Sequence, residues 1–352
     1  MKDNITIGLI GLGAIAVSSH LVHLKEHPAA TIAAVVDMDV ERAKAIAERH
    51  GIPRFYGDMD AMIADGGIDA VMICTPNSSH IPLARKAAEK GIHVFVEKPI
   101  GTELAEVEGY LALAKENGAL TMVGMTHRFR EDVKILKGMV EEQGLGDIHY
   151  MKAKLFRQRG TPKGWFTDLK HSGGGAMMDI GVHVLDLAWW IAGCPDVKSI
   201  AGKTLNVHGN YETKHVSSWQ SANHRLNEQG VFNVEDFGAA WVQFKNGCTL
   251  SLEIAWAVDG EQDEGISLEL YGTKGGASLS PLALFKERDG VLSKTLPVFK
   301  GEDPFKDEVG HFIQCVRTGE DPLIDGEAGM HILKMLKGIY ESSRRGREIY
   351  FD

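Results

Sequence analysis

A glycine-rich segment near the N-terminus has the spacing of a phosphate-binding turn. Residues 11–16, GLGAIA, fit the pattern G-x-G-x-x-A directly after an apolar run and at the start of an expected helix. Gly11 permits a tight turn, and Gly13 lets the main chain approach a pyrophosphate. The helix that starts around Ala14 and Ile15 adds N–H donors and the positive end of its dipole. The segment therefore predicts a dinucleotide-binding site.

An acidic residue stands where this type of site needs one to contact a ribose. Asp37 closes the second apolar run, 21 residues after Ala16. A carboxylate there hydrogen-bonds the adenosine ribose and would repel a 2′-phosphate, so we expect NAD as the cofactor. Arg42, one turn into the next helix, could reach a 2′-phosphate, which leaves NADP as the less favoured choice. The alternative is an ordinary turn in which Asp37 only caps a helix, and the strand–turn–helix context disfavours it.

Two further polar segments follow apolar runs that look like strands. Because ligands of open α/β sheets bind beyond the carboxyl ends of strands, both segments should face the cofactor. Capped turns would use the same residue types, so position alone leaves both interpretations open. The expected cofactor contacts are Thr75, Pro76, Asn77 and His80 in the first segment, and Glu97 and Lys98 in the second.

The elements that must position these residues alternate along residues 1–125. Short apolar runs predict strands, and amphipathic stretches of about 10–15 residues between them predict helices. This alternation is typical of a parallel, doubly wound sheet, here a Rossmann domain. The expected strands are 5–10, 31–37, 69–75, 93–98 and 120–125, and the expected helices are 14–27, 40–50, 80–91 and 103–117.

The pattern changes at about residue 126, and we place a second domain at 126–352. Longer runs of alternating polarity at 149–158, 239–258 and 266–272 predict an antiparallel sheet with one face packed and one free. Asn246-Gly247 predicts a hairpin turn within the second run. Helices are expected at 130–143 and 325–346, which makes this domain α+β.

Composition excludes several classes of protein. The formal net charge of −10 and the lack of a long Lys/Arg block oppose nucleic-acid binding. No run of about 18 apolar residues is present, so no membrane association is expected. The four cysteines are scattered without a CxxC pair, which is typical of reduced thiols in the cytoplasm.

One segment has no clear place in this scheme. Residues 208–224, HGNYETKHVSSWQSANH, contain three histidines and two large aromatic residues. The segment looks like a long insertion. A lid, an arm between subunits and a plain solvated loop are all open interpretations.

Several segments in a fixed order resemble the Gfo/Idh/MocA oxidoreductases, the family of glucose–fructose oxidoreductase and inositol 2-dehydrogenase. The resemblance runs from end to end of the chain. It implies a Rossmann domain followed by an α/β domain with a large open sheet, which often serves as an oligomer interface, so a homodimer or homotetramer is expected. The matching segments are the glycine loop 11–16, Asp37, TPN at 75–77, EKP at 97–99, HRF at 127–129, GGGAMMDIGVHVLDL at 173–187, VEDFGAAWVQFKNG at 234–247 and the closing segment that starts with DGEAGMH at 325.

The resemblance implies three catalytic residues. Lys98 matches the family's active-site lysine, with a Lys98–Pro99 bond that is expected to be cis, and Asp179 and His183 match its D-x-x-x-H motif. Histidine suits the base that removes a hydroxyl proton while a hydride leaves, because its ordinary pKa lies near neutral pH. A lysine ammonium would stabilise the developing alkoxide. Asp179, one helical turn before His183, would orient the ring or bind substrate.

Without the resemblance, the Asp179/His183 pair would more often be structural. Such a pair could also bind a metal, but no HExxH motif or cysteine cluster completes a site, so we expect no metal. Around the pair, candidate substrate contacts are His127, Arg128, Arg157 and Trp165, with Asp179 as a further ligand. An indole face beside polar groups suits a polyol ring, although Trp165 could equally be a core residue.

The sequence thus predicts an NAD-dependent dehydrogenase that oxidises a secondary hydroxyl group of a small-molecule sugar, glycoside or inositol. Two alternatives remain. One is a glycoside hydrolase or lyase that recycles its NAD through transient oxidation. The other is a non-catalytic NAD-binding regulator, since a fold does not guarantee chemistry.

Overall fold

The N-terminal part of the chain forms a six-stranded parallel sheet with helices on both faces. The computed structural model describes residues 2–221, 226–260 and 265–351. The strand order β3-β2-β1-β4-β5-β6 is that of a Rossmann fold, as the sequence predicts. The strands are β1 (Ile5–Ile10), β2 (Ala30–Val36), β3 (Arg54–Tyr56), β4 (Ala70–Ile73), β5 (His93–Glu97) and β6 (Thr121–Gly124), and the helices are α1 (Leu21–Glu26), α2 (Val40–His50), α3 (Met59–Asp65), α4 (His80–Ala88) and α5 (Leu104–Glu116).

Apolar strands and capped helices explain this half of the molecule. All four residues of β4 are buried, as expected for a strand covered on both faces. The carboxylates of Asp39 and Asp58 cap α2 and α3 by accepting hydrogen bonds from main-chain N–H groups. The sequence did not predict β3 and α3. The helix expected at 14–27 is present as a helical stretch over residues 14–26, and it contains a π-helical turn, Ala16–His20, just before α1.

The second half is built on a nine-stranded sheet of order β16-β15-β14-β13-β7-β12-β11-β9-β17. Only β7 and β12 pair in parallel, so the expectation of a large, mostly antiparallel sheet is confirmed. The strands are β7 (Ile148–Phe156), β9 (Val197–Leu205), β11 (Phe237–Phe244), β12 (Thr249–Ala255), β13 (Ser267–Gly272), β14 (Gly275–Leu279), β15 (Leu282–Arg288), β16 (Val291–Thr295) and β17 (Ile349–Tyr350), and a separate pair joins β8 (Thr161–Lys163) to β10 (Val216–Gln220).

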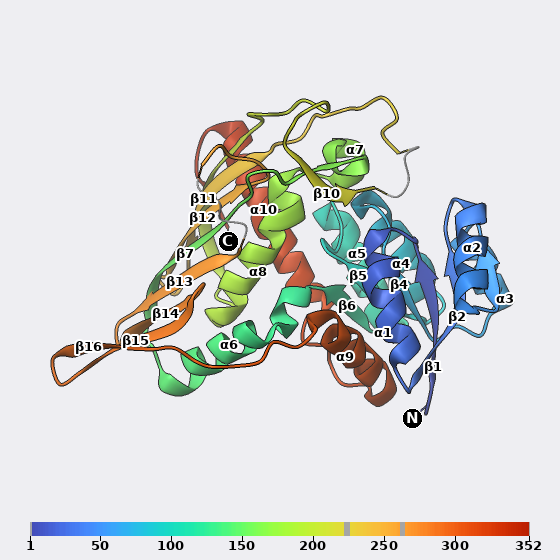
Figure 1. The fold of residues 1–352 in the computed structure, drawn as a ribbon, viewed down its shortest axis with the longest axis horizontal. Coiled ribbons are helices and arrows are strands. Elements are labelled where there is room, and N and C mark those ends of the chain that lie inside the picture. Colours follow the sequence, from blue (N-terminus) through green and yellow to red (C-terminus); the bar gives the residue numbers. More distant parts are fainter. Residues whose placement is uncertain (1, 222–225, 261–264, 352) are drawn as a thin grey trace.

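Helices cover one face of the large sheet and leave the other open. Figure 1 shows α6 (Glu131–Gln143), α8 (Val182–Ile191) and α10 (Gly326–Arg345) between this sheet and the Rossmann half. The burial of β11 alternates along the strand, with Val242 buried and Trp241 46% exposed. Trp241, Tyr150 and Tyr271 form an aromatic row with neighbouring ring centroids 5.8 Å apart.

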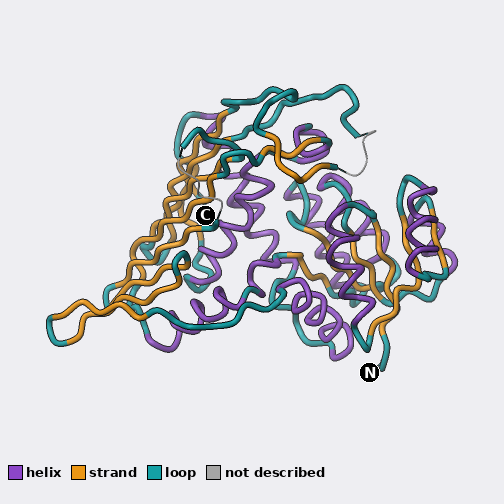
Figure 2. The backbone as a smooth tube through the Cα atoms, in the orientation of Figure 1, coloured by secondary structure: helices purple, strands orange, loops and turns teal. Residues whose placement is uncertain are grey.

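The C-terminal part of the chain returns to the Rossmann half. Helix α9 (Pro304–Thr318) packs against α1, and the N–H of Val123 in β6 donates to the carbonyl of Ile324 over 3.0 Å, just before α10 begins. α10 then crosses to the large sheet and packs along β9. The β15–β16 hairpin extends away from the rest of the molecule (Figure 2). Among the described residues, no helix has both the length and the apolarity to cross a bilayer.

Candidate active site

The glycine loop lies at the carboxyl edge of the Rossmann sheet and leaves room for a ligand. Gly11 has a φ of +81°, and a Cβ atom there would come within 2.7 Å of the Cγ2 of Thr75. Only glycine therefore fits between the first and fourth strands. A Cβ atom on Gly13 would meet no atom within 4 Å, so the space above it is open. This geometry fits a pyrophosphate held against the main chain, with Ala14 exposed and Ile15 half-buried at the start of the helical segment.

Asp37 is tied both to this loop and to an arginine. Its Oδ2 accepts a hydrogen bond from the N–H of Leu12 over 2.9 Å, which links the end of β2 to the loop. Its Oδ1 lies 3.1 Å from a guanidinium nitrogen of Arg42. The position suits an adenosine ribose. The paired cation, however, reduces the repulsion that Asp37 alone would exert on a 2′-phosphate.

The segment after β4 joins the two halves of the chain. The hydroxyl of Ser79 donates to the Oγ1 of Thr75 over 2.7 Å, and Thr75 and Pro76 stay half-buried beside the loop. The Asn77 side chain is buried, and its Nδ2 donates to the carbonyl of Ser172 over 2.7 Å. Asn77 thereby anchors the residues that precede the expected catalytic helix.

Two residues expected to contact the cofactor are buried and bonded within the protein. The ring nitrogens of His80 lie 2.8 Å from the carbonyls of Thr75 and Pro99, and burial lowers the pKa of His80. Glu97 is 8% exposed, and its Oε1 lies 2.6 Å from the Nε2 of His20. Through these contacts both residues hold the loops after β4 and β5 in place. A position at the end of a strand places a residue near the site. It does not determine whether the side chain points toward the ligand or into the protein.

Lys98 is held by an aspartate from the other half of the molecule, and a tryptophan holds that aspartate in turn. The Lys98–Pro99 bond is cis, as expected. The Nζ of Lys98 donates to the Oδ1 of Asp179 over 3.0 Å and to its main-chain carbonyl over 2.7 Å. The indole N–H of Trp256 donates to the second carboxylate oxygen over 2.9 Å. The side chains of Lys98 and Asp179 are 19% and 17% exposed, so the pair can still meet a ligand.

This arrangement sets the charge on Asp179. Burial alone would raise the pKa of its carboxyl group, but the Lys98 ammonium, Arg157 and the two side-chain hydrogen bonds outweigh burial and lower the pKa. Asp179 is therefore a carboxylate that orients Lys98. Neither of its oxygens makes a hydrogen bond to His183, so it does not orient that ring by a direct bond.

His183 stands next to this pair at the start of α8. Asp179 lies in a π-helical turn, Met177–Gly181, where the hydrogen-bond ladder widens, and its carbonyl is used by Lys98. The ring of His183 packs edge-on against that of His127, with centroids 4.6 Å apart. Its Nδ1 is buried and has no hydrogen-bond partner among the described residues. Its Nε2 also makes no hydrogen bond to a described residue, and the side chain is half-buried.

Both histidines are held in the neutral form. Burial, followed by Lys98, His127 and Arg157, keeps the pKa of His183 well below its ordinary value of 6.5. Burial and the cations Arg130, Lys98 and Arg157 lower the pKa of His127 to about 3. A neutral imidazole beside a lysine ammonium can accept a proton from a hydroxyl group while the ammonium stabilises the oxygen left behind.

A buried glutamate, which we did not identify from the sequence, fixes the turn before α8. Glu235 accepts hydrogen bonds from the N–H groups of Gly175 and Met177, each over 2.9 Å, and from the Tyr340 hydroxyl over 2.8 Å. A Cβ atom on Gly175 would lie 1.8 Å from the Glu235 carbonyl oxygen. Glu235 lies in the VEDF segment that carries the family resemblance. Trp256 had no such signal, because its role depends on long-range strand pairing.

The expected substrate contacts separate into two groups. Arg157 is half-buried near Asp179 and His183 and has no ion pair among the described residues. Trp165 is half-buried in a turn next to α7 (Leu169–Ser172). Both remain candidates. Arg128 does not, because its guanidinium is buried and bound to both carboxylate oxygens of Asp186, at 2.9 and 2.7 Å.

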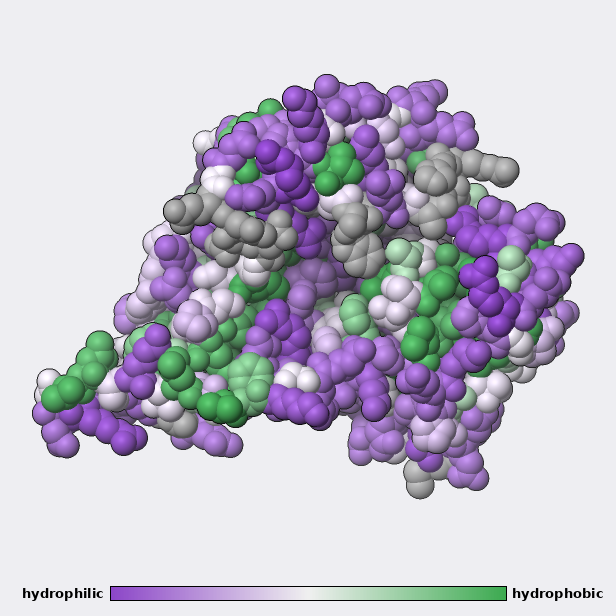
Figure 3. Space-filling view, in the orientation of Figure 1, coloured by the Kyte–Doolittle hydropathy of each residue, from purple (hydrophilic) through white to green (hydrophobic). Residues whose placement is uncertain are grey.

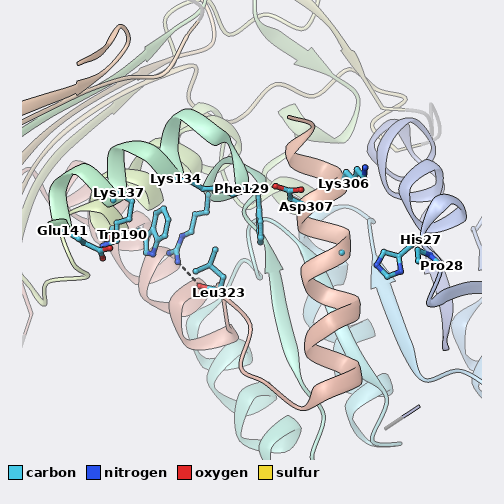
Figure 4. Close-up of a pocket in the computed structure, with 13 residues that line it drawn as sticks. His27, Pro28, Phe129, Lys134, Lys137, Glu141, Trp190, Lys306, Asp307 and Leu323 are labelled. Atoms are coloured by element: carbon cyan, nitrogen blue, oxygen red, sulfur yellow. Dashed lines mark hydrogen bonds and ion pairs between the residues drawn. The ribbon is translucent and has the colours of Figure 1, made fainter. Parts of the chain in front are cut away.

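A hollow between the two halves is visible in Figure 3. A separate pocket of about 820 Å³ lies between α6, α9 and the residues after α1 (Figure 4). There Lys134 pairs with Asp307, Lys137 pairs with Glu141, and Arg128 lies over the Trp190 ring. Two of its three lysines pair with neighbouring carboxylates, and none of the expected catalytic or cofactor residues lines it. We therefore do not assign it to the active site.

Comparisons with known proteins agree with this architecture. Residues 5–125 match the Gfo/Idh/MocA model described as "Oxidoreductase family, NAD-binding Rossmann fold", and residues 137–351 match the model described as "Oxidoreductase family, C-terminal alpha/beta domain". The two matches together cover most of the chain.

Individual relatives match over nearly their full lengths. D-glucoside 3-dehydrogenase of Escherichia coli is 28% identical, over 97% of this chain and 96% of the relative. The NAD(+)-dependent scyllo-inositol 2-dehydrogenase of Bacillus subtilis is 27% identical, over 100% and 98%. A crystal structure of aldose-aldose oxidoreductase from Caulobacter crescentus, complexed with glycerol, has a TM-score of 0.81 at 25% identity and covers 99% of this chain and 100% of that one.

Proposed function

Because the chain belongs to the Gfo/Idh/MocA oxidoreductase family, we propose that it is an NAD-dependent dehydrogenase acting on a secondary hydroxyl group of a sugar, glycoside or inositol. The observation that carries this proposal is the grouping of Lys98, Asp179 and the neutral His183 beside the carboxyl edge of the Rossmann sheet. Alcohol oxidation needs this set, namely a base for the hydroxyl proton and a cation for the alkoxide.

The cofactor would bind along the carboxyl edge of the sheet. The main chain at Gly11 and Gly13 would hold the pyrophosphate, Asp37 the adenosine ribose, and Thr75 and Pro76 the nicotinamide half. When bound there, NAD supplies the hydride acceptor. His80 and Glu97 hold the loops after β4 and β5 in place through their buried contacts.

The remaining chemistry falls to the chain's own side chains. The Nε2 of His183 accepts the hydroxyl proton, and the Nζ of Lys98 donates a hydrogen bond to the oxygen as it becomes a carbonyl. Asp179, itself held by Trp256, keeps Lys98 aimed at that oxygen. His127 packs against His183 and limits its rotation. Water exclusion by these buried groups strengthens every interaction at the reacting oxygen.

The substrate class rests on the relatives and on two side chains. Two of the relatives are named as dehydrogenases of a glucoside and of an inositol, both of which are polyol rings. Arg157, with no ion pair among the described residues, can donate to ring hydroxyls from its fixed fork of N–H groups. Trp165 offers an apolar face that suits the C–H side of a sugar ring.

The test is NADH formation at 340 nm with a panel of glycosides, free sugars, inositols and sugar acids, with NAD and NADP in parallel. We expect at least one polyol to give NADH, with NAD preferred. If a glycoside is cleaved without accumulation of NADH, the protein is a hydrolase or lyase that recycles its cofactor. If NAD binds but no compound yields NADH and no glycosidic bond is cleaved, the dehydrogenase proposal is wrong. That result would favour the hypothesis of a non-catalytic NAD-binding regulator.

A further inference from the structure

A second group of chemically competent side chains lies outside the catalytic trio. His208 and His215 come from the segment between β9 and β11, and Asp259 follows β12. One ligand atom from each residue lies within 4.8 Å of the other two. The two imidazole rings are 4.5 Å apart between centroids. Within residues 2–221, 226–260 and 265–351, no other three His, Cys, Asp or Glu residues meet in this way.

The main chain around these residues is anchored on several sides. The N–H groups of Val207 and His208 both donate to the carboxylate of Asp236. The carbonyl of His215 accepts a hydrogen bond from the N–H of Thr161 over 2.9 Å. On the other side, the N–H of Val258, next to Asp259, donates to the carbonyl of Arg157 over 2.9 Å. Each ligand-bearing segment is thus tied to a distant part of the chain, so the grouping follows from the fold rather than from one local loop.

The donor set matches a transition metal better than a hard cation. The Nδ1 of His215 lies 3.4 Å from the carbonyl of Gln158, and donation to that oxygen leaves Nε2 with a free lone pair. Two imidazoles and one carboxylate are typical ligands of zinc and its neighbours, whereas magnesium and calcium prefer oxygen ligands alone.

The separation of the ligand atoms is compatible with metal binding after a small movement. Tetrahedral zinc with ligands at about 2.0–2.1 Å places them about 3.4 Å apart. The three side chains would therefore draw together by at most about 1.4 Å, and water could complete the shell. Arg159 lies 3.4 Å from a carboxylate oxygen of Asp259, but its side chain is 50% exposed and can turn into solvent.

We propose that His208, His215 and Asp259 form a structural binding site for a divalent transition-metal ion, with zinc as the first candidate. The ion would fix the segment around His208 and His215 to the end of β12. That strand end also carries Trp256, which holds Asp179, and β10 pairs with β8 just before Trp165. Figure 1 shows β10 between the large sheet and the Rossmann half. The site would stabilise the part of the chain that carries Trp256 and take no part in the reaction itself.

Binding can be measured on the full-length chain without a histidine tag and without substrate, so the result does not depend on the proposed function. After treatment with EDTA and its removal, zinc chloride is titrated by calorimetry, and bound zinc is counted by mass spectrometry. We expect about one zinc ion per chain, with a dissociation constant on the order of 1 μM or tighter. His215→Ala and Asp259→Ala should each weaken binding at least tenfold.

Matched variants separate this site from adventitious binding. His149→Ala removes an exposed histidine at the opposite end of β7 and should leave zinc binding unchanged. Arg159→Gln removes the competing cation and should bind zinc at least as tightly as the wild type. Circular dichroism confirms that each variant is folded. The proposal is overturned if the wild type binds no zinc at 100 μM, or if the folded His208→Ala/His215→Ala double variant binds it as the wild type does.

Discussion

At the residue scale, the charge state of His183 decides whether it can act as a base. The ring must be neutral to accept a proton, and its pKa lies well below 6.5 because of burial and the nearby cations. For alcohol oxidation, kcat/KM should therefore stay constant as the pH falls through 6.5 and decline only at clearly lower pH. A pH profile of kcat/KM checks this, and a half-maximal value at or above pH 6.5 would contradict it.

Arg157 offers a matched variant for the same property. Its positive charge helps to lower the pKa of His183, so Arg157→Gln should move the acid limb of the profile to higher pH. Arg159→Gln removes a half-exposed arginine two residues away and serves as the control. Equal shifts in both variants would indicate a general charge effect rather than an effect at His183.

Cofactor choice is a second property of single residues. Asp37→Asn keeps an oxygen that can accept the hydrogen bond from Leu12 but removes the negative charge. Arg42 then has no carboxylate partner at position 37 and can pair with a 2′-phosphate. The ratio of kcat/KM for NAD to that for NADP should therefore fall about tenfold or more. Asp39→Asn, a nearby exposed carboxylate, should change the ratio much less. An unchanged ratio in Asp37→Asn would remove Asp37 from cofactor selection.

At the element scale, the turn before α8 depends on one buried carboxylate. Glu235 accepts three hydrogen bonds from Gly175, Met177 and Tyr340, and a glutamine amide has only one acceptor oxygen. Glu235→Gln should therefore lower the free energy of unfolding by about 1–3 kcal/mol. Denaturant unfolding measures this, with the exposed Glu108→Gln as control. Equal stability of the two variants would mean that the hydrogen bonds of Glu235 contribute little to the stability of the fold.

The same scale shows what the sequence could and could not predict. Strand and helix alternation predicted the Rossmann half, and the glycine loop is where its motif placed it. The sides on which His80 and Glu97 lie could not be predicted, because being near a strand end does not define the direction of a side chain. The partner of Asp179 could not be predicted either. Trp256 reaches it through the pairing of β12 with β7, which are about 100 residues apart.

At the scale of the whole molecule, the open face of the nine-stranded sheet is the surface to test for self-association. Trp241 and Tyr271 are 46% and 42% exposed and stand in one row with Tyr150. Contiguous exposed aromatic groups on a sheet face are typical of interaction surfaces. We propose that this face joins copies of the chain in a dimer or tetramer.

A single substitution tests that assembly. Trp241→Glu places a charge at the most exposed end of the row, next to Tyr150, and should reduce the molar mass measured by light scattering, with the circular dichroism spectrum unchanged. Phe55→Glu, on the exposed edge strand of the Rossmann half, is the control and should keep the wild-type mass. If the wild type is already a monomer, or if Trp241→Glu keeps its mass, the interface lies elsewhere or is absent.

The most direct test of the central claim is a single-turnover measurement of NADH formation with wild type and His183→Ala, with NAD affinity measured on the same preparations. With a substrate found in the panel, the wild type should form NADH. The variant should be slower by about a hundredfold or more, with unchanged NAD affinity, because it lacks the proposed base and His183 lies outside the cofactor loops. A variant that forms NADH at nearly the wild-type rate would contradict the account and assign the proton transfer to another residue.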